Sequence, residues 1–325
     1  MRVAIADNNG TKFTKDIIEH WGKKHEVKFE RGASEFLAQW ADVYYVDTWD
    51  NNIHYLYKLY HGQQEIPKEL KWDNKKKPRI IVRALDWEVW IGLARSQEMA
   101  DWVDDVVVIA PHIKKRMLED KDNATGQTLN WNGKIHLIRP GVNLEKFSFK
   151  QTETDGFQVG MVLGDMWWMK NHMGGLDIFT TLHQKDPRWK LHIRGQHEGG
   201  NDYWKTMYEY YLDSRGIRDS VTLYEHVEDM NFWYEKIDYL LHPGMKEAFC
   251  YAVGEAMAKG IKPIINNFYG SEDIWGNGYM YNTHAQAIQQ FSNYRIKPSI
   301  DYRHFIEDNY NSKRMMEEYD ELVGA

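Results

Sequence analysis

Residues 242–270 read HPGMKEAFCYAVGEAMAKGIKPIINNFYG and carry the clearest structural pattern in the chain. A short apolar run, 239–242, leads into a turn that contains Gly244, and a helix is expected near 252–259. A second β-branched run follows at 263–266. A strand, a helix and a second strand in this order are typical of a parallel sheet with crossover helices. The stretch therefore predicts one βαβ unit whose helix begins at the carboxyl end of a strand.

The same alternation runs along the whole chain. Further strands are expected at 2–6, 41–46, 79–82, 106–110, 134–138, 157–163, 189–194 and 221–223. Further helices are expected from about Thr14 and near 53–61, 87–103, 173–183, 202–215 and 230–236. The polar, non-periodic segment 149–156 is the best linker candidate. We therefore predict an α/β chain of two Rossmann-like domains, 1–150 and 151–301, facing each other across a cleft.

Composition excludes several classes of protein. The chain has 325 residues, enough for two domains of about 150 each. Apolar residues make up 42% of the chain, but no run approaches the roughly 20 apolar residues that span a bilayer. The first strand reaches Asp7 too soon for a secretory signal, and a single cysteine excludes an intrachain disulfide framework. We expect a cytoplasmic protein with no integral membrane segment.

Charge is distributed unevenly. Residues 1–150 hold 24 Lys and Arg against 22 Asp and Glu, whereas the remainder holds 17 against 26. A mildly basic first half favours an anionic acceptor or peripheral membrane contact, or it is ordinary surface variation. It is much weaker than the basic stripe that binding to duplex DNA normally needs. A nucleic-acid partner is therefore not favoured.

Two glutamates stand near the start of the expected helix of the 242–270 stretch. Glu247 and Glu255 are eight residues apart. Free backbone N–H groups at a helix N-terminus suit a diphosphate, through hydrogen bonds and the helix dipole. A carboxylate deeper on the same element suits vicinal hydroxyls, because it accepts two hydrogen bonds. Alternatively, Glu247 complements the helix dipole and Glu255 is a surface carboxylate.

The flanking residues resemble the signature of retaining glycosyltransferases of the GT-B fold, glycosyltransferase family 4 in particular. The residues that fall in register with that signature are Pro243, Glu247, Phe249, Glu255, Ala256, Ala258 and Gly260. Gly244 stands where serine is usual, and Ala248 stands where glycine is usual. The match lies in the stretch that predicts the βαβ unit.

Three other segments resemble the same family in chain order. Residues 138–147, IRPGVNLEKF, look like the element that closes the first domain. Residues 159–170 look like the strand and loop that carry a phosphate-binding lysine. Residues 302–322 resemble the terminal helix that crosses back, so 302–325 is expected to pack on the N-terminal domain. The resemblance covers most of 105–325 and is only topological before residue 105.

The resemblance implies a role for each matching residue. Glu255 would hold the ribose hydroxyls of a nucleotide-sugar donor, Glu247 would contact the sugar near its anomeric centre, and Lys170 would neutralise the diphosphate. Lys170 and Glu247 are thus the catalytic candidates. The remaining donor-binding candidates are Gly244, the backbone of Ala248, Phe249, Cys250 and Tyr251, the nucleobase neighbours His226 and Val227, and Arg194. Lys170 as a solvated lysine and His226 as an ordinary loop histidine remain alternatives.

The chain departs from the family pattern at three places. Gly164 stands where an arginine usually precedes the phosphate-binding lysine, and Arg194 is a candidate substitute or an ordinary surface residue. The family's first-domain histidine has no counterpart, which leaves Arg83 and Asp86 as the polar candidates there. The first loop has Asn9 and Gly10 in place of a glycine pair. These four residues are the acceptor-side candidates.

The expected reaction is transfer of a sugar from a nucleoside-diphosphate sugar to an acceptor hydroxyl, with retention of anomeric configuration. No metal or other cofactor is expected, because Lys170 and the helix terminus take the place of a cation. The acceptor is a saccharide, a lipid-linked sugar or another hydroxyl compound. The alternatives are a catalytically silent nucleotide-sugar-binding module, a nucleotide-sugar epimerase and a viral-type glucosyltransferase that modifies DNA.

Overall fold

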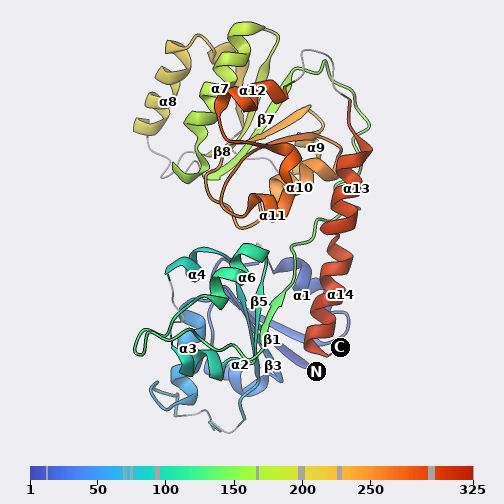
Figure 1. Cartoon of the computed structure of the whole chain (residues 1–325). Helices are drawn as coiled ribbons and strands as arrows, with labels where there is room; N and C mark the ends of the chain where they lie inside the picture. The colour runs from blue at the N-terminus through green and yellow to red at the C-terminus, as the bar shows by residue number, and fades with distance from the viewer. Residues whose placement is uncertain are drawn as a thin grey trace. The chain divides into compact units, whose positions relative to one another are not determined.

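The chain divides into two compact units. The structure is a computed structural model that describes every residue except 12–13, 69, 71, 74–75, 92–95, 166–167, 197–201, 225–228, 292–296 and 325. Unit 1 comprises Met1–Arg139 and Arg314–Ala325, and unit 2 comprises Pro140–Lys313. Each unit contains a six-stranded parallel sheet with helices, which is the α/β architecture of two Rossmann-like domains (Figure 1). The bounds expected from the sequence, 150 and 301, differ from these.

The sheet of unit 1 has the strand order β2-β1-β3-β4-β5-β6. Its strands are β1 (Arg2–Asp7), β2 (Glu26–Glu30), β3 (Val43–Asp47), β4 (Arg79–Ala84), β5 (Asp105–Val108) and β6 (Ile135–Leu137). Its helices are α1 (Lys15–Trp21), α2 (Glu35–Trp40), α3 (Asn51–Tyr60), α4 (Trp87–Ile91), α5 (Gln97–Trp102), α6 (Pro111–Leu118) and most of α14 (Ser312–Val323). The central strands β3 and β5 are buried along their whole length, as near-continuous apolar runs predict.

The C-terminal helix α14 completes the core of unit 1. Tyr319 on α14 packs edge to face on Trp21 of α1 and Tyr45 of β3, with ring centroids 6.0 and 5.9 Å apart. Asp320 accepts hydrogen bonds from His20 and Lys24, at 2.8 and 2.6 Å. Aromatic pairs of this geometry stabilise a core beyond their buried area. The end of the chain therefore belongs to the fold of unit 1, close to β1 (Figure 1).

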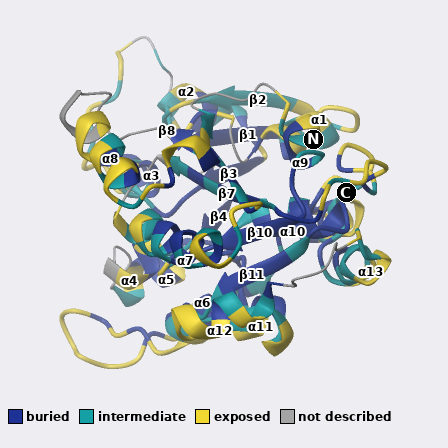
Figure 2. Cartoon of the chain, turned by 90° about the horizontal axis from the view of Figure 1, so that it is seen from above, coloured by how far each residue is buried: buried dark blue, intermediate teal, exposed yellow. Residues whose placement is uncertain are grey.

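The sheet of unit 2 has the strand order β12-β11-β10-β7-β8-β9. Its strands are β7 (Gln158–Asp165), β8 (Lys190–Gln196), β9 (Val221–Tyr224), β10 (Tyr239–His242), β11 (Lys262–Asn266) and β12 (Met280–Tyr281). Its α-helices are α7 (His172–Lys185), α8 (Asp202–Ser214), α9 (Met230–Tyr234), α10 (Tyr251–Ala258), α11 (Ser271–Trp275), α12 (His284–Gln290) and α13 (Ile300–Asn309). Short 3₁₀ turns lie at η1 (Trp168–Lys170), η3 (Arg218–Ser220) and η4 (Asn277–Tyr279). Figure 2 shows β10 and β11 mostly buried.

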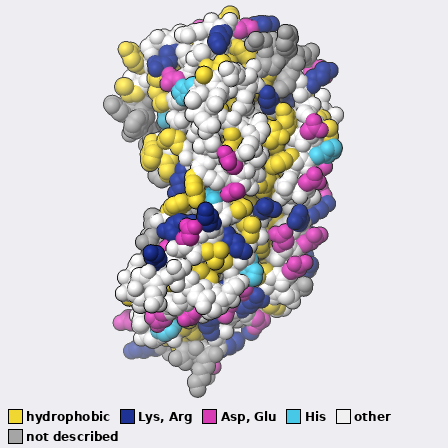
Figure 3. Space-filling model, in the orientation of Figure 1, with side chains coloured by type: hydrophobic (Ala, Val, Ile, Leu, Met, Phe, Trp, Pro, Cys, Tyr) yellow, Lys and Arg dark blue, Asp and Glu magenta, His cyan; other side chains and the backbone are white. Residues whose placement is uncertain are grey.

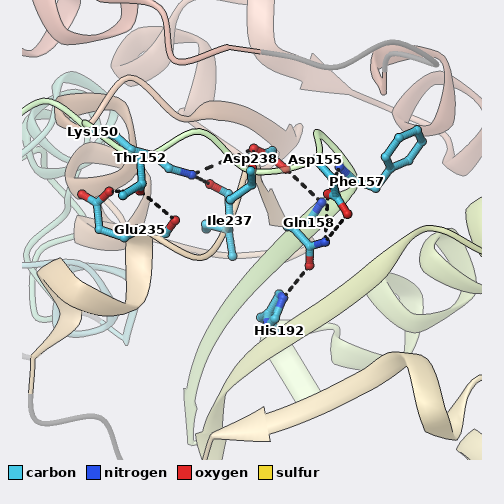
Figure 4. Close-up of polar contacts among 10 residues, drawn as sticks. Lys150, Thr152, Asp155, Phe157, Gln158, His192, Glu235, Ile237 and Asp238 are labelled. Atoms are coloured by element: carbon cyan, nitrogen blue, oxygen red, sulfur yellow. Dashed lines mark hydrogen bonds and ion pairs between the residues drawn. The ribbon is translucent and has the colours of Figure 1, made fainter.

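The segment expected to be a linker packs against unit 2. Lys150 is only 3% exposed, and its Nζ donates to the Ile237 carbonyl at 2.6 Å and lies 3.9 Å from Asp238. Burial lowers the pKa of Lys150 and raises the pKa of Asp238. The charge of each residue partly offsets the pKa shift that burial causes in the other. Figure 4 shows this contact and the hydrogen bond from Thr152 to Glu235. These contacts explain why unit 2 begins before the segment.

Several elements differ from those expected. The single helix expected over 87–103 is two helices, α4 and α5, and the terminal stretch forms α13 in unit 2 and α14 mostly in unit 1. The sequence pattern missed the edge strands β2 and β12, because β2 alternates charged with apolar residues and β12 has only two residues. Within the described ranges, no helix has both the length and the apolar character needed to cross a membrane.

Candidate active site

The loops after β7 and β10 meet at the carboxyl edge of the sheet of unit 2. The chain proceeds from β7 outward to β8 and β9, and from β10 outward in the other direction to β11 and β12. The adjacent strands β7 and β10 therefore mark a topological switch point, where open α/β sheets bind ligands. The Met245 N–H donates to the Met169 carbonyl at 2.9 Å, and the Asn171 side chain donates to the Pro243 carbonyl at 3.1 Å. These bonds hold the two loops together.

This arrangement brings Lys170 and Glu247 into contact. Lys170 ends η1 after β7, and Glu247 lies in the loop between β10 and α10. The Lys170 ammonium donates a hydrogen bond to Glu247 Oε1. The side chains are 30% and 13% exposed, so both are partly accessible to a ligand. A cation and a carboxylate at one point can bind a phosphate and a sugar hydroxyl, respectively.

Glu255 lies deeper, on α10, beside Tyr234 of α9. The Tyr234 hydroxyl donates to Glu255 Oε2 at 2.8 Å. Burial raises the pKa of Glu255 to about 7, although the Tyr234 hydrogen bond and the charge of Lys146 act to lower it. A buried carboxylate with spare acceptor capacity is stabilised in its charged form by a ligand that donates further hydrogen bonds. The carboxylate can therefore hold hydroxyl groups.

His242 and Cys250 join the same site, and the sequence reasoning gave no role to His242. His242 ends β10 and is 3% exposed; its Nδ1 lies 3.5 Å from Cys250 Sγ and its Nε2 lies 3.8 Å from Glu247 Oε1. Burial lowers the pKa of His242 to about 4 and raises the pKa of the Cys250 thiol to about 12. The pair is thus a neutral imidazole and a thiol near pH 7, not an activated nucleophile. The sequence did contain a signal for His242, because a histidine at the end of a buried strand indicates a functional position.

The N-terminus of α10 opens into this loop. Cys250 is its N-cap residue with φ +74°, and within the described residues no side chain caps the helix. Phe249 is 3% exposed and packs on Trp275 and Tyr310, with ring centroids 4.9 Å away in each case. The Phe249 side chain therefore belongs to the core and leaves only backbone groups for a ligand. Its neighbour Tyr251 contacts it edge to face.

The remaining donor-side candidates are placed less directly. Ala248 is half-buried in the loop with Glu247, and Gly244 is buried behind it. Arg194 is half-buried near the end of β8, and its buried Nε has no hydrogen-bond partner in the described part of the chain. His226 and Val227 lie outside the described residues.

A second row of charged groups lies at the carboxyl edge of unit 1. Asp7, Asp47 and Arg83 end or nearly end β1, β3 and β4 and stand side by side in the strand register. Arg83 Nη2 donates to Asp47 Oδ2 at 2.9 Å, and its Nε lies 2.5 Å from Oδ1. Burial, and then the charge of Asp47, raise the pKa of Asp7. Asp7 and Asp47 flank the switch point of this sheet, between β1 and β3.

The acceptor-side candidates lie around this row. Asn9 is exposed and its N–H donates to Asp7 Oδ1 at 2.8 Å, while Gly10 turns the chain at φ +73°. Asp86 accepts a hydrogen bond from Trp90 Nε1 at 2.8 Å. Arg83 is only 4% exposed and forms a buried ion pair with Asp47. Asn9 is therefore the most accessible of the four candidates, and Arg83 has a structural partner.

The Asp47–Arg83 pair predicts a large effect on stability. Replacing Asp47 by alanine leaves the buried Arg83 guanidinium without its carboxylate, and breaking a buried pair in this way costs about 3–5 kcal/mol. We expect the free energy of unfolding of unit 1, followed by urea denaturation of the full chain, to fall by this amount. Asp42→Ala is the matched control, because its pair with Arg2 is 43% and 37% exposed and such pairs contribute at most about 1 kcal/mol. Equal effects of the two substitutions would contradict the assignment.

The profile of glycosyl transferases group 1 matches residues 144–312. The chain belongs to this family. The match includes η1, the β10–α10 loop and α10, and so covers Lys170, Glu247 and Glu255 of this glycosyltransferase. A comparison with curated proteins gives no match.

Solved structures agree on the fold of this glycosyltransferase. A glycosyltransferase from Rickettsia africae is 13% identical, with a TM-score of 0.72 over 99% of this chain and 97% of that one. Sucrose-phosphate synthase from Thermosynechococcus elongatus is 12% identical, with a TM-score of 0.71 over 99% and 98%. HepE from Anabaena, solved with UDP and glucose, is 12% identical, with a TM-score of 0.68 over 100% and 99%. The expected GT-B fold is thereby confirmed.

Proposed function

We propose that the chain transfers a sugar from a nucleoside-diphosphate sugar to an acceptor hydroxyl, with retention of anomeric configuration and without a metal ion. One observation carries the proposal: Lys170 and Glu247 meet at the switch point of unit 2, beside the N-terminus of α10. A diphosphate needs a cation and backbone N–H groups that donate hydrogen bonds, and a sugar needs a group that accepts hydrogen bonds from its hydroxyls. The Lys170 ammonium, the N-terminus of α10 and the Glu247 carboxylate provide these three groups.

In this proposal, α10 binds the donor at two levels. Backbone N–H groups of 248–251 and the Lys170 ammonium face the diphosphate. The Glu255 carboxylate accepts hydrogen bonds from both ribose hydroxyls, with the Tyr234 hydroxyl holding its Oε2. These donated bonds offset the cost of charging a buried carboxyl.

Lys170 has the larger catalytic role. Negative charge grows on the departing diphosphate as the glycosidic bond breaks, and a positioned cation stabilises this charge most in the transition state. When the donor binds, the Lys170 ammonium would leave Glu247 and contact the diphosphate instead. Glu247 is then free to accept from a sugar hydroxyl, and the departing phosphate takes the proton of the acceptor. We assign no covalent intermediate to Glu247.

The acceptor is assigned to unit 1, around Asn9 and Asp86. On the face shown in Figure 3, Lys and Arg side chains are interspersed with Asp and Glu. This mixture supports a sugar or another small hydroxyl compound over the backbone of duplex DNA. A cytoplasmic location, with peripheral membrane contact for a lipid-linked acceptor, completes the proposal.

A thermal-shift series tests donor binding. UDP-, GDP- and ADP-sugars are added with and without EDTA to the unmodified chain, to Glu255→Ala and to the exposed control Glu272→Ala. At about 100 times its dissociation constant, the correct donor stabilises the protein by about 2.7 kcal/mol. We expect one nucleotide to give a shift that EDTA leaves unchanged, that Glu255→Ala loses and that Glu272→Ala keeps. A shift without release of nucleotide during incubation with acceptors would identify a silent binding module, and no shift at all would contradict the proposal.

A further inference from the structure

Three side chains of different ligand types converge behind the Lys170–Glu247 contact. His242, Glu247 and Cys250 each offer one nitrogen, oxygen or sulfur atom, and these atoms lie within 4.8 Å of one another. His242 Nδ1 and Cys250 Sγ are 3.5 Å apart, and His242 Nε2 and Glu247 Oε1 are 3.8 Å apart. Imidazole, thiolate and carboxylate are the protein ligands of Zn²⁺.

The imidazole of His242 is unsatisfied in this position. Its side chain is 3% exposed, and in the described residues its Nε2 has no hydrogen-bond partner. Most buried polar atoms have a partner, so an unpaired one points to a missing ligand. Glu247 Oε1 lies 3.8 Å from this nitrogen, which exceeds hydrogen-bond distance.

Gly244 lies close beside this nitrogen. A Cβ atom at residue 244 would lie 2.9 Å from His242 Nε2, which is closer than real Cβ atoms approach, and 3.4 Å from Glu247 Oε1. The serine that is usual here in the pattern this stretch resembles would place its Cβ there. The glycine therefore keeps a side chain from pressing on the imidazole nitrogen and the carboxylate on this side.

We propose that His242, Glu247 and Cys250 form a site for Zn²⁺ or a divalent cation of similar softness, and that the bound cation takes Glu247 from Lys170 and inhibits sugar transfer. The inhibition, unlike the binding, rests on the proposed function. On binding, the Cys250 thiol releases its proton to solvent, and new metal bonds form to sulfur, to one imidazole nitrogen and to a carboxylate oxygen.

The distances are compatible with this site after a small adjustment. Tetrahedral zinc with bonds of about 2.0–2.3 Å separates its ligand atoms by roughly 3.3–3.8 Å. One imidazole nitrogen binds the cation, and the separation of 3.8 Å between His242 Nε2 and Glu247 Oε1 is at the upper end of this range. The three ligand atoms lie within 4.8 Å of one another, and a rotation of the Cys250 side chain brings its sulfur closer to the other two. A water molecule completes the tetrahedron. Because Lys170 contacts the same Oε1, its positive charge opposes the cation and must move away.

Cobalt binding gives a readout that does not depend on activity. Co²⁺ replaces Zn²⁺ in such sites, and a thiolate ligand gives a charge-transfer absorption band. The chain has one cysteine, so this band can arise only from Cys250. We expect a saturable band with one cobalt per chain, which Zn²⁺ abolishes by displacement. Cys250→Ser should remove the band, His242→Gln should weaken cobalt binding at least tenfold, and the exposed control His284→Gln should leave it unchanged.

Two further variants test the geometry without removing a ligand. Gly244→Ala places a Cβ atom against His242 Nε2, which displaces the imidazole, and should weaken cobalt binding at least tenfold. Lys170→Gln removes the opposing charge and should strengthen cobalt binding about tenfold. No band, or a band that His242→Gln and Gly244→Ala leave unchanged, would overturn the site. Protection of Cys250 by Zn²⁺ against a thiol reagent gives a second measurement on the unmodified chain.

Inhibition is measured separately from binding. Zn²⁺ should compete with the nucleotide-sugar donor, and the activity that Cys250→Ser retains should be at least tenfold less sensitive to Zn²⁺. Cobalt binding in a chain without transferase activity would leave the metal site intact and refute the proposed function. Transfer that Zn²⁺ does not inhibit, in a chain that binds cobalt, would refute only the inhibition.

Discussion

Replacing Lys170 by alanine should lower the rate of sugar transfer by about 10²–10³-fold. This is the loss typical when one preorganised group that stabilises transition-state charge is removed. Backbone hydrogen bonds fix the short 3₁₀ turn of Lys170, and the Glu247 carboxylate accepts a hydrogen bond from its ammonium, so the cation is positioned before the donor arrives. Since the charge on the diphosphate grows during bond breaking, kcat should fall more than donor affinity. The measurement is steady-state transfer together with donor binding by calorimetry.

Two controls separate this role from a general effect of charge. Lys313 forms an exposed pair with Glu145 in the same unit, with side chains 74% and 78% exposed. Lys313→Ala should leave both kcat and donor affinity within about twofold. Lys170→Arg keeps the charge but alters its geometry, and should recover part of the rate. A Lys170→Ala enzyme within threefold of the unmodified rate would show that another group carries the phosphate charge.

The architecture followed from the sequence because most strands are buried and apolar. Strands such as β3 and β10 are buried at every position and stand out as short runs of apolar and aromatic residues. Edge strands lack this signal. Glu26–Glu30 alternates charged with apolar residues at the edge of its sheet, and periodicity alone does not separate it from a polar loop.

The candidate site was accessible from the sequence only where a family resemblance placed it. Glu247 and Glu255 stand in register with that signature, but their spacing alone left a surface role open. The unpaired imidazole of His242 depends on burial and on the path of the β10–α10 loop, which are tertiary properties. The Asp47–Arg83 pair likewise joins two strands 36 residues apart, although both residues follow apolar runs. Polar residues at the ends of buried strands, such as these, were a sequence signal for the site that the predictions did not use.

Glu255→Gln should have opposite effects on donor binding and on stability. Ribose hydroxyls stabilise the carboxylate, so donor binding should weaken about tenfold for each pH unit below the Glu255 pKa of about 7. The glutamine variant should bind the donor at least tenfold more weakly at pH 8 and lose this pH dependence. Calorimetric titrations from pH 5.5 to about pH 8.5 measure both effects. Unchanged pH dependence in the variant would assign the titration to another group.

The sign of the stability effect follows from the same pKa. Folding raises the pKa of Glu255 from its ordinary value of 4.5 to about 7. Below pH 4.5 the carboxyl is protonated in both states and does not lower the free energy of unfolding. As pH rises from 4.5 to about 7, the unfolded chain loses this proton first, so Glu255 lowers the free energy of unfolding progressively. Glu255→Gln should therefore match the unmodified chain near pH 4 and exceed its free energy of unfolding by at most about 3 kcal/mol at pH 8.

Glu235→Gln provides a control of opposite sign. Lys259 donates to Glu235 at 2.6 Å and, together with Thr152, lowers the pKa of Glu235 despite its burial. Glu235 therefore contributes stability above pH 4.5 that is lost as pH falls through its lowered pKa, so Glu235→Gln should be less stable at pH 8. A purely structural role for Glu255 would make both substitutions destabilising there. A gain in stability accompanied by a loss of donor binding is instead expected of a carboxylate kept buried for its ligand.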